Sequence, residues 1–403
     1  MENNKLISLA SKYGCPLYVY DAEKIISQFQ RFEKAFSGVT NLKINFATKA
    51  LSNVNILKLM KSLGSNLDCV SIQEVQLGLK AGFLPKELSF TPSGVSFEEI
   101  KMAVNIGTKI NIDNLPMLEA FGSEFPEIPV CIRINPNITA GGNQKISVGH
   151  NKAKFGIPTN QISKVKEIEE KTGMRINGVH MHTGSDILDV KVFLDAAEVL
   201  FSVAKEFKDL DFIDFGGGFK VAYKEDDPST NVEKFGKIIT KRFNDFCTEY
   251  GKDLSIIFEP GKFLVSESGR FLAKVNVIKE TDYVTFAGID AGFNHLIRPM
   301  YYGAYHHITN ISNPTGKEKK YTVVGYICET DTFGEDRMIN KINAGDILSF
   351  QNAGAYAFTM ASNYNSRFRP PEVMIYQGKD FLIRKRETME DIFRNQIEVE
   401  LKL

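Results

Sequence analysis

The chain has 403 residues, of which 43% are hydrophobic and 24% charged, as in a soluble globular protein with a substantial core. Its 49 basic residues equal its 49 acidic ones, so no overall field favours nucleic acid or an anionic membrane as a partner. Residues 1–20 lack the apolar region of a signal peptide, and no run is long enough to span a membrane. The five cysteines show no metal-type spacing, and their odd number argues against a disulfide framework. We therefore expect a cytoplasmic protein of two or three domains.

Eight short apolar runs, each ending in a polar residue or glycine, occupy the first two thirds of the chain. Most are rich in valine, isoleucine, leucine and phenylalanine without clean alternation, which is typical of parallel strands covered on both faces. The runs are Leu42–Ala50, Asn66–Ser71, Leu88–Pro92, Lys109–Asp113, Val130–Pro136, Ile176–Ser185, Asp211–Gly218 and Ser255–Gly261.

Amphipathic stretches follow most of these runs, among them Asn53–Leu63, Ile72–Ala81 and Phe193–Phe207. In Asn53–Leu63 the apolar residues recur at helical spacing and form one stripe. Eight strand-then-helix units predict an α/β fold, namely a (β/α)8 barrel of the TIM type over residues 25–265. A doubly wound sheet is the alternative, but the glycine fingerprint that follows its first strand is missing.

The texture of the sequence changes after about Gly261, where several segments have the composition of strands. We expect helical structure there only around Gly354–Asn363 and in the polar tail. The strand-like Pro16–Tyr20 precedes the barrel and should join these later strands. A mostly β domain is therefore predicted for residues 1–24 and 266–403, with strands at Lys274–Lys279, Tyr283–Asp290, Tyr321–Cys328, Asp346–Phe350 and the hairpin Glu372–Arg384.

The carboxyl ends of barrel strands gather on one face, where enzymes of this fold carry out their chemistry. Lys49 ends the first run, and a lysine there can act as a Schiff-base nucleophile, although a lone lysine more often reaches solvent. His180 and His182 end the sixth run on the same side. One of them could bind a metal or lie over a flat ring, and no HxxxH or carboxylate spacing supports a metal.

The seventh run ends in three consecutive glycines, Gly216, Gly217 and Gly218, and the eighth in Glu259-Pro260-Gly261-Lys262. Glycines let backbone N–H groups close on a phosphate, and the loop after strand seven is a usual phosphate site in barrels, although most such runs are only turns. Glu259 puts a carboxylate at the site, or else forms a surface salt bridge. A lysine, a ring, a phosphate cradle and a carboxylate are together the parts that hold pyridoxal phosphate. Lys49 would carry it covalently, His182 would stack on its ring, the glycines would hold its phosphate and Glu259 would pair with its pyridine nitrogen.

With these motifs in place, the chain resembles the fold-type III pyridoxal-phosphate-dependent decarboxylases, and among them most closely the diaminopimelate decarboxylases. The resemblance runs from about Pro16 to Val373. It implies decarboxylation of meso-2,6-diaminopimelate to L-lysine and CO2, the last step of lysine biosynthesis, by a homodimer with shared active sites at its interface. The motifs are Phe46–Ala50, His180–Ser185, Asp214–Gly218, Glu259–Gly261, Asp290–Asn294, Leu296–Pro299, Cys328–Glu329, Asn352–Tyr356 and Met360–Asn365.

The resemblance also implies roles for single residues. Arg298 and Tyr302 would bind the distal carboxylate of the substrate, and Glu329 its distal ammonium. Cys328 would be the proton donor in the neighbouring subunit's site, and Tyr356 would contact cofactor and substrate. Further cofactor contacts would come from Asp68, Arg133, Ser185, Gly261 and Lys262, of which Lys262 would also contact substrate. Taken singly, Cys328 also fits a buried structural cysteine, Tyr302 a packed aromatic, and Arg298 with Glu329 a surface ion pair.

Three positions depart from the family pattern. Lys262 replaces an arginine, which keeps the charge but loses bidentate geometry, and His295 replaces an acidic residue. The segment Cys328–Thr332 reads Cys-Glu-Thr-Asp-Thr in place of Cys-Glu-Ser-Gly-Asp, on the element that separates decarboxylases by substrate.

Three rival functions follow from the same motifs. A polyamine-pathway decarboxylase acting on ornithine or carboxynorspermidine is the nearest, but ornithine has no distal carboxylate for Arg298. An alanine-type racemase would place arginine against the pyridine nitrogen, where this chain has Glu259. A non-catalytic cofactor-binding relative that binds a partner protein would have no need of Lys49, Glu259 and Cys328 together.

Overall fold

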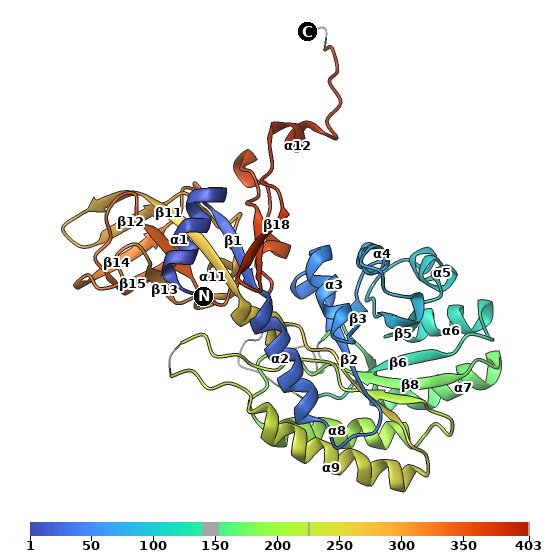
Figure 1. The fold of residues 1–403 in the computed structure, drawn as a ribbon. Coiled ribbons are helices and arrows are strands. Elements are labelled where there is room, and N and C mark those ends of the chain that lie inside the picture. Colours follow the sequence, from blue (N-terminus) through green and yellow to red (C-terminus); the bar gives the residue numbers. More distant parts are fainter. Residues whose placement is uncertain (139–152, 225, 402–403) are drawn as a thin grey trace. The chain divides into compact units, whose positions relative to one another are not determined.

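The computed structural model describes residues 1–138, 153–224 and 226–401 (Figure 1). The chain forms two compact units. The barrel unit comprises residues 26–222 and 228–264, and the β-rich unit comprises residues 1–25, 223–227 and 265–403. Among the described residues, no helix combines the length and apolar character needed to cross a membrane.

Eight parallel strands form a closed ring in the barrel unit (Figure 1). Pairing runs in the order β5-β4-β3-β2-β10-β9-β8-β6, and β5 also pairs with β6, which closes the barrel. This closure confirms the predicted (β/α)8 architecture. The strands are β2 (Leu42–Ala47), β3 (Asn66–Cys69), β4 (Leu88–Phe90), β5 (Lys109–Ile112), β6 (Val130–Asn135), β8 (Ile176–Met181), β9 (Phe212–Asp214) and β10 (Ser255–Phe258), with the short β7 (Ile157–Pro158) beside β6.

Polar side chains fix where most of the barrel helices begin. Asn53, Ser71 and Asp189, for example, each accept a hydrogen bond from a backbone N–H of the first helical turn, which satisfies a group that the helix itself leaves unpaired. The predicted helices after the first and second strands are confirmed, and the one predicted at Phe193–Phe207 begins three residues earlier. The helices are α2 (Ala22–Ala35), α3 (Val54–Ser62), α4 (Ile72–Lys80), α5 (Phe97–Ile106), α6 (Leu115–Glu124), α7 (Ile162–Thr172), α8 (Val190–Ala204), α9 (Val232–Tyr250) and α10 (Lys262–Val265).

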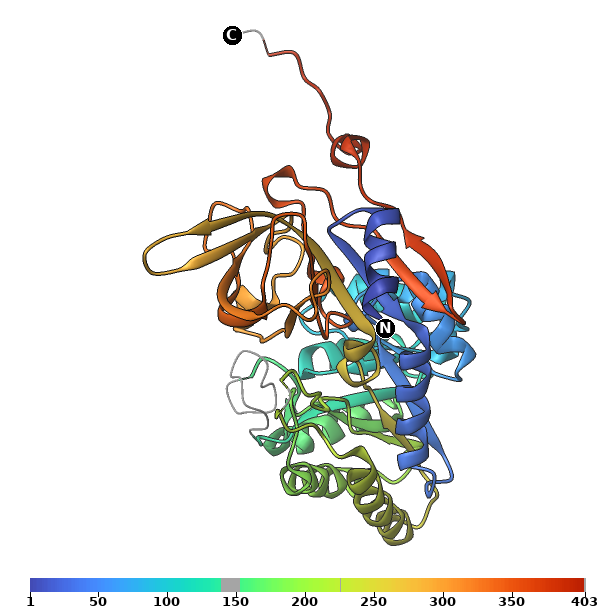
Figure 2. The ribbon, with the colours of Figure 1, turned by 60° about the vertical axis from the view of Figure 1, so that its left-hand side comes forward.

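The β-rich unit contains a nine-stranded sheet whose main path is β15-β14-β12-β11-β1-β17-β18, with β16 paired to β11 and β13 paired to β16. Figure 2 shows the N-terminal strand (blue) beside the C-terminal hairpin (red) of this unit. Its N-terminal strand β1 pairs antiparallel with β11 and parallel with β17, as predicted for Pro16–Tyr20. The elements are α1 (Asn3–Tyr13), β1 (Leu17–Asp21), β11 (Gly269–Glu280), β12 (Thr285–Ile289), α11 (Arg298–Tyr302), β13 (Ile308–Asn310), β14 (Glu318–Val324), β15 (Thr332–Asn340), β16 (Ile347–Phe350), β17 (Glu372–Tyr376), β18 (Lys379–Arg384) and α12 (Met389–Phe393).

Several elements differ from the sequence prediction. The sixth and seventh runs end as strands at Met181 and Asp214, earlier than predicted. After Asp214 the backbone turns at Gly216, whose φ of 65° no strand permits. Helix α1 was missed, although its Leu6 and Leu9 pack against β1. The edge strand β15 was also missed, since charged residues occupy its middle. Instead of a longer helix, Gly354–Asn363 contains only the 3-10 turn Phe358–Met360.

Candidate active site

Lys49 lies just beyond β2, in the 3-10 turn η1 (Thr48–Ala50), at the carboxyl end of the strand. Its Nζ lies 3.1 Å from Oδ2 of Asp68, on the neighbouring strand β3. Asp68 is buried, and its Oδ1 has no hydrogen-bond partner in the described part of the chain. Burial and the negative charge of Glu259 raise the pKa of Asp68, and the charge of Lys49 opposes them. The structure thus brings two predicted cofactor-binding residues into direct contact.

Glu259 directly follows β10 and is buried beside His180 of β8. Oε2 of Glu259 lies 3.1 Å from Nε2 of His180, whereas its Oε1 has no partner among the described residues. Burial alone would raise the pKa of Glu259, but the charge and hydrogen bond of His180, with the charge of Lys49, lower it to about 2. An ionised, buried carboxylate with one open oxygen fits a protonated pyridine nitrogen, which is the group the sequence predicts for this position.

A second acid, Asp214 at the end of β9, lies against this pair. Ligand atoms of His180, Asp214 and Glu259 all lie within 4.8 Å of one another, close enough to share a cation or a proton. Burial and the negative charge of Glu259 raise the pKa of Asp214 well above its ordinary value, so a proton on Asp214 allows the two acids to adjoin. The sequence analysis offered His180 only as a possible metal ligand or ring contact and named Asp214 only as the first residue of a family motif, so it missed the contact of both with Glu259.

His182 lies one residue beyond β8, and its Nδ1 accepts a hydrogen bond of 3.2 Å from the N–H of Gly217. Because Nδ1 accepts, the neutral ring carries its proton on Nε2. Burial and the positive charges of Arg133 and Lys49 lower the pKa of His182 to about 3, which keeps the ring neutral near pH 7. A neutral ring held at a fixed angle suits the predicted stacking on a flat cofactor. Arg133 itself is buried in β6, with its guanidinium 4.8 Å from the ring centre of Phe155.

The triple-glycine loop tolerates no side chain, because neighbouring backbone lies too close. A Cβ at Gly217 would lie 2.2 Å from the carbonyl oxygen of Glu259, and one at Gly218 would lie 2.1 Å from that of Gly184. The N–H of Gly216 donates to Oδ1 of Asp214 at 2.9 Å, and that of Gly217 donates to His182. Each of these two N–H groups already has a protein acceptor, so a bound phosphate would share the N–H group with that acceptor. The cradle itself fits the predicted phosphate site.

The loops after β8 and β10 meet through an ion pair whose lysine is buried and whose aspartate is partly exposed. Nζ of Lys262 lies 2.6 Å from Oδ1 of Asp186, the residue after Ser185, and Lys262 is only 8% exposed. The N–H of Ile187 donates to the carbonyl of Gly218 at 2.9 Å, which ties the Ser185 loop to the glycine loop. Ser185 thus lies on the loop after β8, which is connected to the segment of Gly261 and Lys262 after β10 and to the glycine loop after β9. The sequence analysis missed Asp186, whose only signal was its position beside Ser185.

In the β-rich unit, Arg298 begins α11 and is buried among tyrosines. Its guanidinium carbon lies 5.8, 5.6 and 6.0 Å from the ring centres of Tyr223, Tyr302 and Tyr356, and its Nη2 donates to the hydroxyl of Tyr223 at 3.3 Å. Its Nε has no partner among the described residues. The structure therefore places Arg298 beside Tyr302 and Tyr356, and Tyr223 is a neighbour that the sequence did not reveal. A buried guanidinium with an open donor suits an anionic ligand group.

Cys328 and Glu329 lie on an exposed turn between β14 and β15 of the same unit. Glu329 accepts a hydrogen bond from the hydroxyl of Tyr364, and Nδ2 of Asn365 lies 3.6 Å from Sγ of Cys328. In the described part of the chain, no hydrogen bond or ion pair joins Glu329 to Arg298. The two residues therefore do not form the surface ion pair that was the alternative interpretation of the sequence. The exposed Cys328 is also unlike a buried structural cysteine.

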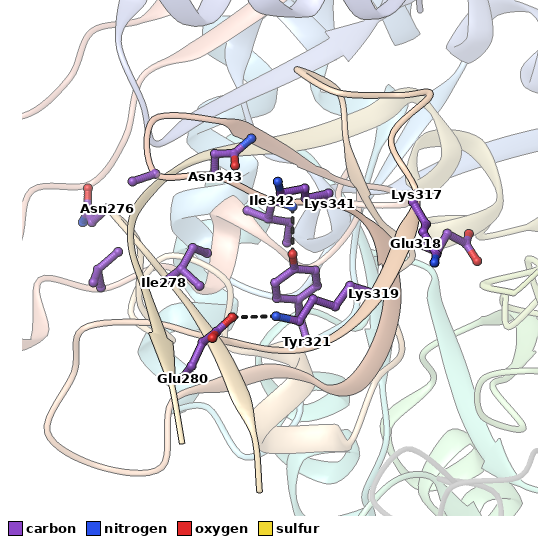
Figure 3. A pocket seen from close by; sticks show the side chains of 12 residues that line it. Asn276, Ile278, Glu280, Lys317, Glu318, Lys319, Tyr321, Lys341, Ile342 and Asn343 are labelled. Atoms are coloured by element: carbon purple, nitrogen blue, oxygen red, sulfur yellow. Dashed lines mark hydrogen bonds and ion pairs between the residues drawn. The ribbon is translucent and has the colours of Figure 1, made fainter. Parts of the chain in front are cut away.

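The β-rich unit has a cavity of about 820 Å³ (Figure 3). Its walls come from β11, β14 and the loop after β15, and Lys319 and Glu280 pair across it at 2.6 Å. The hydroxyl of Tyr321, another residue of the cavity wall, accepts a hydrogen bond of 3.0 Å from the N–H of Ile342. None of the predicted site residues lines this cavity, so it is not the candidate site.

Known proteins share both the sequence and the fold. Residues 22–266 match the family described as "Pyridoxal-dependent decarboxylase, pyridoxal binding domain". The diaminopimelate decarboxylase of Methanothermobacter thermautotrophicus is 37% identical over 97% of this chain and 93% of that protein, and that of Zymomonas mobilis is 34% identical over 99% and 97%. The crystal structure of the Helicobacter pylori diaminopimelate decarboxylase complexed with L-lysine has a TM-score of 0.89 at 34% identity, covering 96% of this chain and 98% of that one. With its closed barrel and its lysine, histidine and glutamate at the strand ends, the chain belongs to the diaminopimelate decarboxylase family of pyridoxal-dependent decarboxylases.

Proposed function

We propose that this chain removes one carboxyl group from meso-2,6-diaminopimelate and releases L-lysine and CO2, with pyridoxal 5'-phosphate as its cofactor. The observation that carries the proposal is the arrangement of Lys49, Asp68, His180 and Glu259 at the strand ends of the barrel. It combines an amine able to form a Schiff base with a buried carboxylate whose Oε1 is open. The family supplies the reaction class, and the names of the relatives supply the substrate.

The barrel residues divide the work of holding the cofactor. Lys49 would hold it covalently, the neutral ring of His182 would contact its ring, and Glu259 would accept a hydrogen bond from its pyridine nitrogen. When bound, pyridoxal phosphate supplies a conjugated cation that accepts the electron pair left behind by CO2. Supporting contacts are assigned to Asp68, Arg133, Ser185, Gly216, Gly217, Gly218, Gly261, Lys262 and Tyr356.

His180 acts through Glu259. Its hydrogen bond and charge, with the charge of Lys49, lower the pKa of Glu259 to about 2, so the carboxylate is ionised near pH 7. A glutamate that stays ionised keeps the pyridine nitrogen protonated, which favours decarboxylation over the weaker electron sink of a racemase.

The far end of the substrate carries a carboxylate and an ammonium, and the β-rich unit offers a partner for each. Arg298, with its open Nε and its tyrosine neighbours Tyr302 and Tyr356, binds the carboxylate. Glu329 binds the ammonium, and Lys262 of the barrel adds a positive charge for a substrate carboxylate. Ornithine would leave the buried Arg298 without an anion, which disfavours the polyamine-pathway rival.

Cys328 supplies the proton that replaces CO2 on the substrate carbon. We assign residues 25–265 to the cofactor-binding domain, and residues 1–24 and 266–403 to a domain that contributes substrate-binding and dimer-interface residues. In the proposed homodimer, Cys328 and Glu329 of one chain complete the site of the other, which would cover the exposed turn that carries them. The enzyme would work in the cytoplasm.

The test is CO2 release from meso-diaminopimelate, ornithine and carboxynorspermidine, each at the same concentration with the holoenzyme. Release from diaminopimelate alone, with lysine as product, is the expected result. Faster release from either polyamine precursor would overturn the substrate assignment and leave the reaction class standing. No release from any of the three, with the cofactor demonstrably bound, would favour a non-catalytic relative.

A further inference from the structure

The segment Tyr364–Asn365 ends a sequence motif to which the proposed function gives no role. It lies in the 3-10 turn η7 (Tyr364–Ser366), within the β-rich unit. Nδ2 of Asn365 lies 3.6 Å from Sγ of Cys328, and the hydroxyl of Tyr364 donates to the carboxylate of Glu329. Cys328 and Glu329, which the proposed function assigns to proton delivery and ammonium binding, are thus contacted by Asn365 and Tyr364 of one other loop.

The loop that carries Asn365 is held in a defined conformation. Asn365 and Ser366 have φ values of 56° and 55°, in the left-handed region that asparagine tolerates better than most residues. The Tyr364 ring stacks on Phe293 with centres 5.3 Å apart and an interplanar angle of 28°. Nδ2 of Asn363 donates to the carbonyl of Arg367 at 3.0 Å and closes the loop across its base.

The turn that carries Cys328 is fixed from its other side by Asp331. This buried carboxylate accepts the N–H of Phe293 at 2.6 Å and the N–H of Ile327 at 2.9 Å. A Cβ at Gly325 would lie 2.1 Å from Oδ2 of Asp331, so glycine leaves the space that the carboxylate fills. Phe293 therefore links the two loops, because its N–H bonds Asp331 and its ring packs on Tyr364.

An amide N–H directed at sulfur has two consequences for a proton donor. It fixes the position of Sγ, and since the sulfur accepts there, the thiol's own hydrogen points elsewhere. When the thiol gives up its proton the sulfur becomes an anion, and hydrogen bonds to ionised acceptors are about twice as strong as those to neutral ones. The contact therefore strengthens as the proton leaves.

We infer that Asn365 is a positioning residue for Cys328 and that Tyr364 positions Glu329. The inference rests on the proposed function, in which Cys328 is the proton donor. In that step the S–H bond of Cys328 breaks and a C–H bond forms at the carbon that has lost CO2. Sulfur keeps the electron pair as a thiolate beside the Asn365 amide until water returns a proton.

The test compares Asn365→Ala and Asn365→Asp with the control Ser366→Ala, an exposed neighbour on the same loop. The holoenzymes are assayed for kcat and KM with meso-diaminopimelate, and separately for alkylation of Cys328 by iodoacetamide at fixed pH. Within a single chain Cys328 is the exposed cysteine of the five, and a Cys328→Ala blank corrects for the others. Loss of one hydrogen bond to a charged group predicts a fall in kcat of about 10-fold with KM nearly unchanged, and several-fold slower alkylation.

Asn365→Asp should be at least as impaired as Asn365→Ala, because an ionised carboxylate accepts and cannot donate. Tyr364→Phe should raise KM about 3- to 10-fold and leave alkylation unchanged, since it loses the Glu329 contact alone. Asn365→Ala with the alkylation rate and kcat of Ser366→Ala would overturn the inference, as would a fully active Asn365→Asp.

The two proposals fail in different ways. If Cys328→Ala decarboxylates as fast as the wild type, the proton-donor role is wrong, and the inference about catalysis falls with it. If Cys328→Ala is impaired but Asn365→Ala alkylates and reacts normally, the donor role stands and only the positioning role of Asn365 is lost.

Discussion

The two units of the molecule hold their functional residues in opposite ways. In the barrel, Asp68, His180 and Glu259 are buried and paired, and each lies at the end of a strand in a closed ring. In the β-rich unit, Cys328 and Glu329 are exposed, and their partners Tyr364 and Asn365 are exposed as well. The proposed cofactor-binding set is therefore preorganised within one chain, whereas Cys328, the proposed proton donor, would be shielded from water only if another surface covered it.

The two sets of residues should therefore differ in how well their geometry survives substitutions. Groups in the barrel are fixed by backbone geometry, such as the approach of Gly217 to Glu259, and tolerate little change. Groups on the exposed turn depend on a few side-chain contacts and, in the proposed homodimer, on a second copy of the chain. Variants in the two regions should accordingly fail in different assays.

The largest effect is expected for Lys49→Ala, which removes the only group proposed to hold the cofactor covalently. Activity should fall by at least about 1000-fold, and the visible absorption of the bound cofactor should change. Borohydride reduction of the wild-type holoenzyme should fix the pyridoxyl group to Lys49, as peptide mapping would show. Lys43→Ala, an exposed lysine on the same strand, is the control and should retain activity. A label on Lys43 or Lys262 would mean that the barrel register assigned to the site is wrong.

The next effect concerns Arg298, which is buried like the barrel residues but belongs to the β-rich unit. Removing one partner of a desolvated charge pair costs about 2–5 kcal/mol, or roughly 30- to 4000-fold. Arg298→Ala should lower kcat/KM for diaminopimelate by that factor while cofactor affinity, measured by absorbance titration, stays near wild type. Arg337→Ala, a partly buried arginine of β15 outside the proposed site, serves as the matched control. Unchanged kinetics would remove the case for a distal carboxylate and revive the polyamine reading.

A third experiment asks whether the exposed turn acts in the other subunit. Lys49→Ala and Cys328→Ala homodimers should each be severely impaired. After subunit exchange, half the dimers are mixed, and each mixed dimer has one site with both groups and one with neither. Activity should then recover to about a quarter of wild type. No recovery despite proven exchange would place both residues in the same chain's site, or make Cys328 structural.

Sequence alone predicted the barrel well because each of its strands is a buried apolar run followed by an amphipathic helix, and such local patterns determine the order of pairing. It also predicted which residues end the strands, including Lys49 and Glu259. It could not predict partners that depend on three-dimensional proximity. The bond between His180 and Glu259 joins residues 79 positions apart, and that between Lys262 and Asp186 joins residues 76 apart.

In the β-rich unit the sequence was less informative. Edge strand β15 carries a block of three consecutive charged residues between its few buried ones, so its composition resembles a loop. The contacts of Asn365 with Cys328 and of Tyr364 with Glu329 depend on left-handed backbone at Asn365, which no pattern of side-chain types announces. The roles of Cys328 and Glu329 came from family resemblance and still depend on the experiments above.

The smallest effect is expected in stability, at the carboxylate that supports the exposed turn. Burial raises the pKa of Asp331 from 3.8 to about 6, against the opposing hydrogen bonds from Ile327 and Phe293. Because ionisation is harder in the folded state, the stabilising contribution of the protonated group is complete below about pH 4 and is lost as pH rises through about 6.

Asp331→Asn cannot ionise, so it escapes this loss, although it loses an acceptor for one N–H at every pH. The melting temperature of the wild type minus that of Asp331→Asn should therefore fall between pH 4 and pH 7, by the equivalent of at most about 3 kcal/mol. Comparing the difference at the two pH values cancels every other titrating group. Asp336→Asn, the same change at an exposed position of β15, should show no such trend. If the difference in melting temperature between the wild type and Asp331→Asn is constant across this range, the carboxylate ionises as easily in the folded protein as in the unfolded chain. Burial would then not raise the pKa of Asp331.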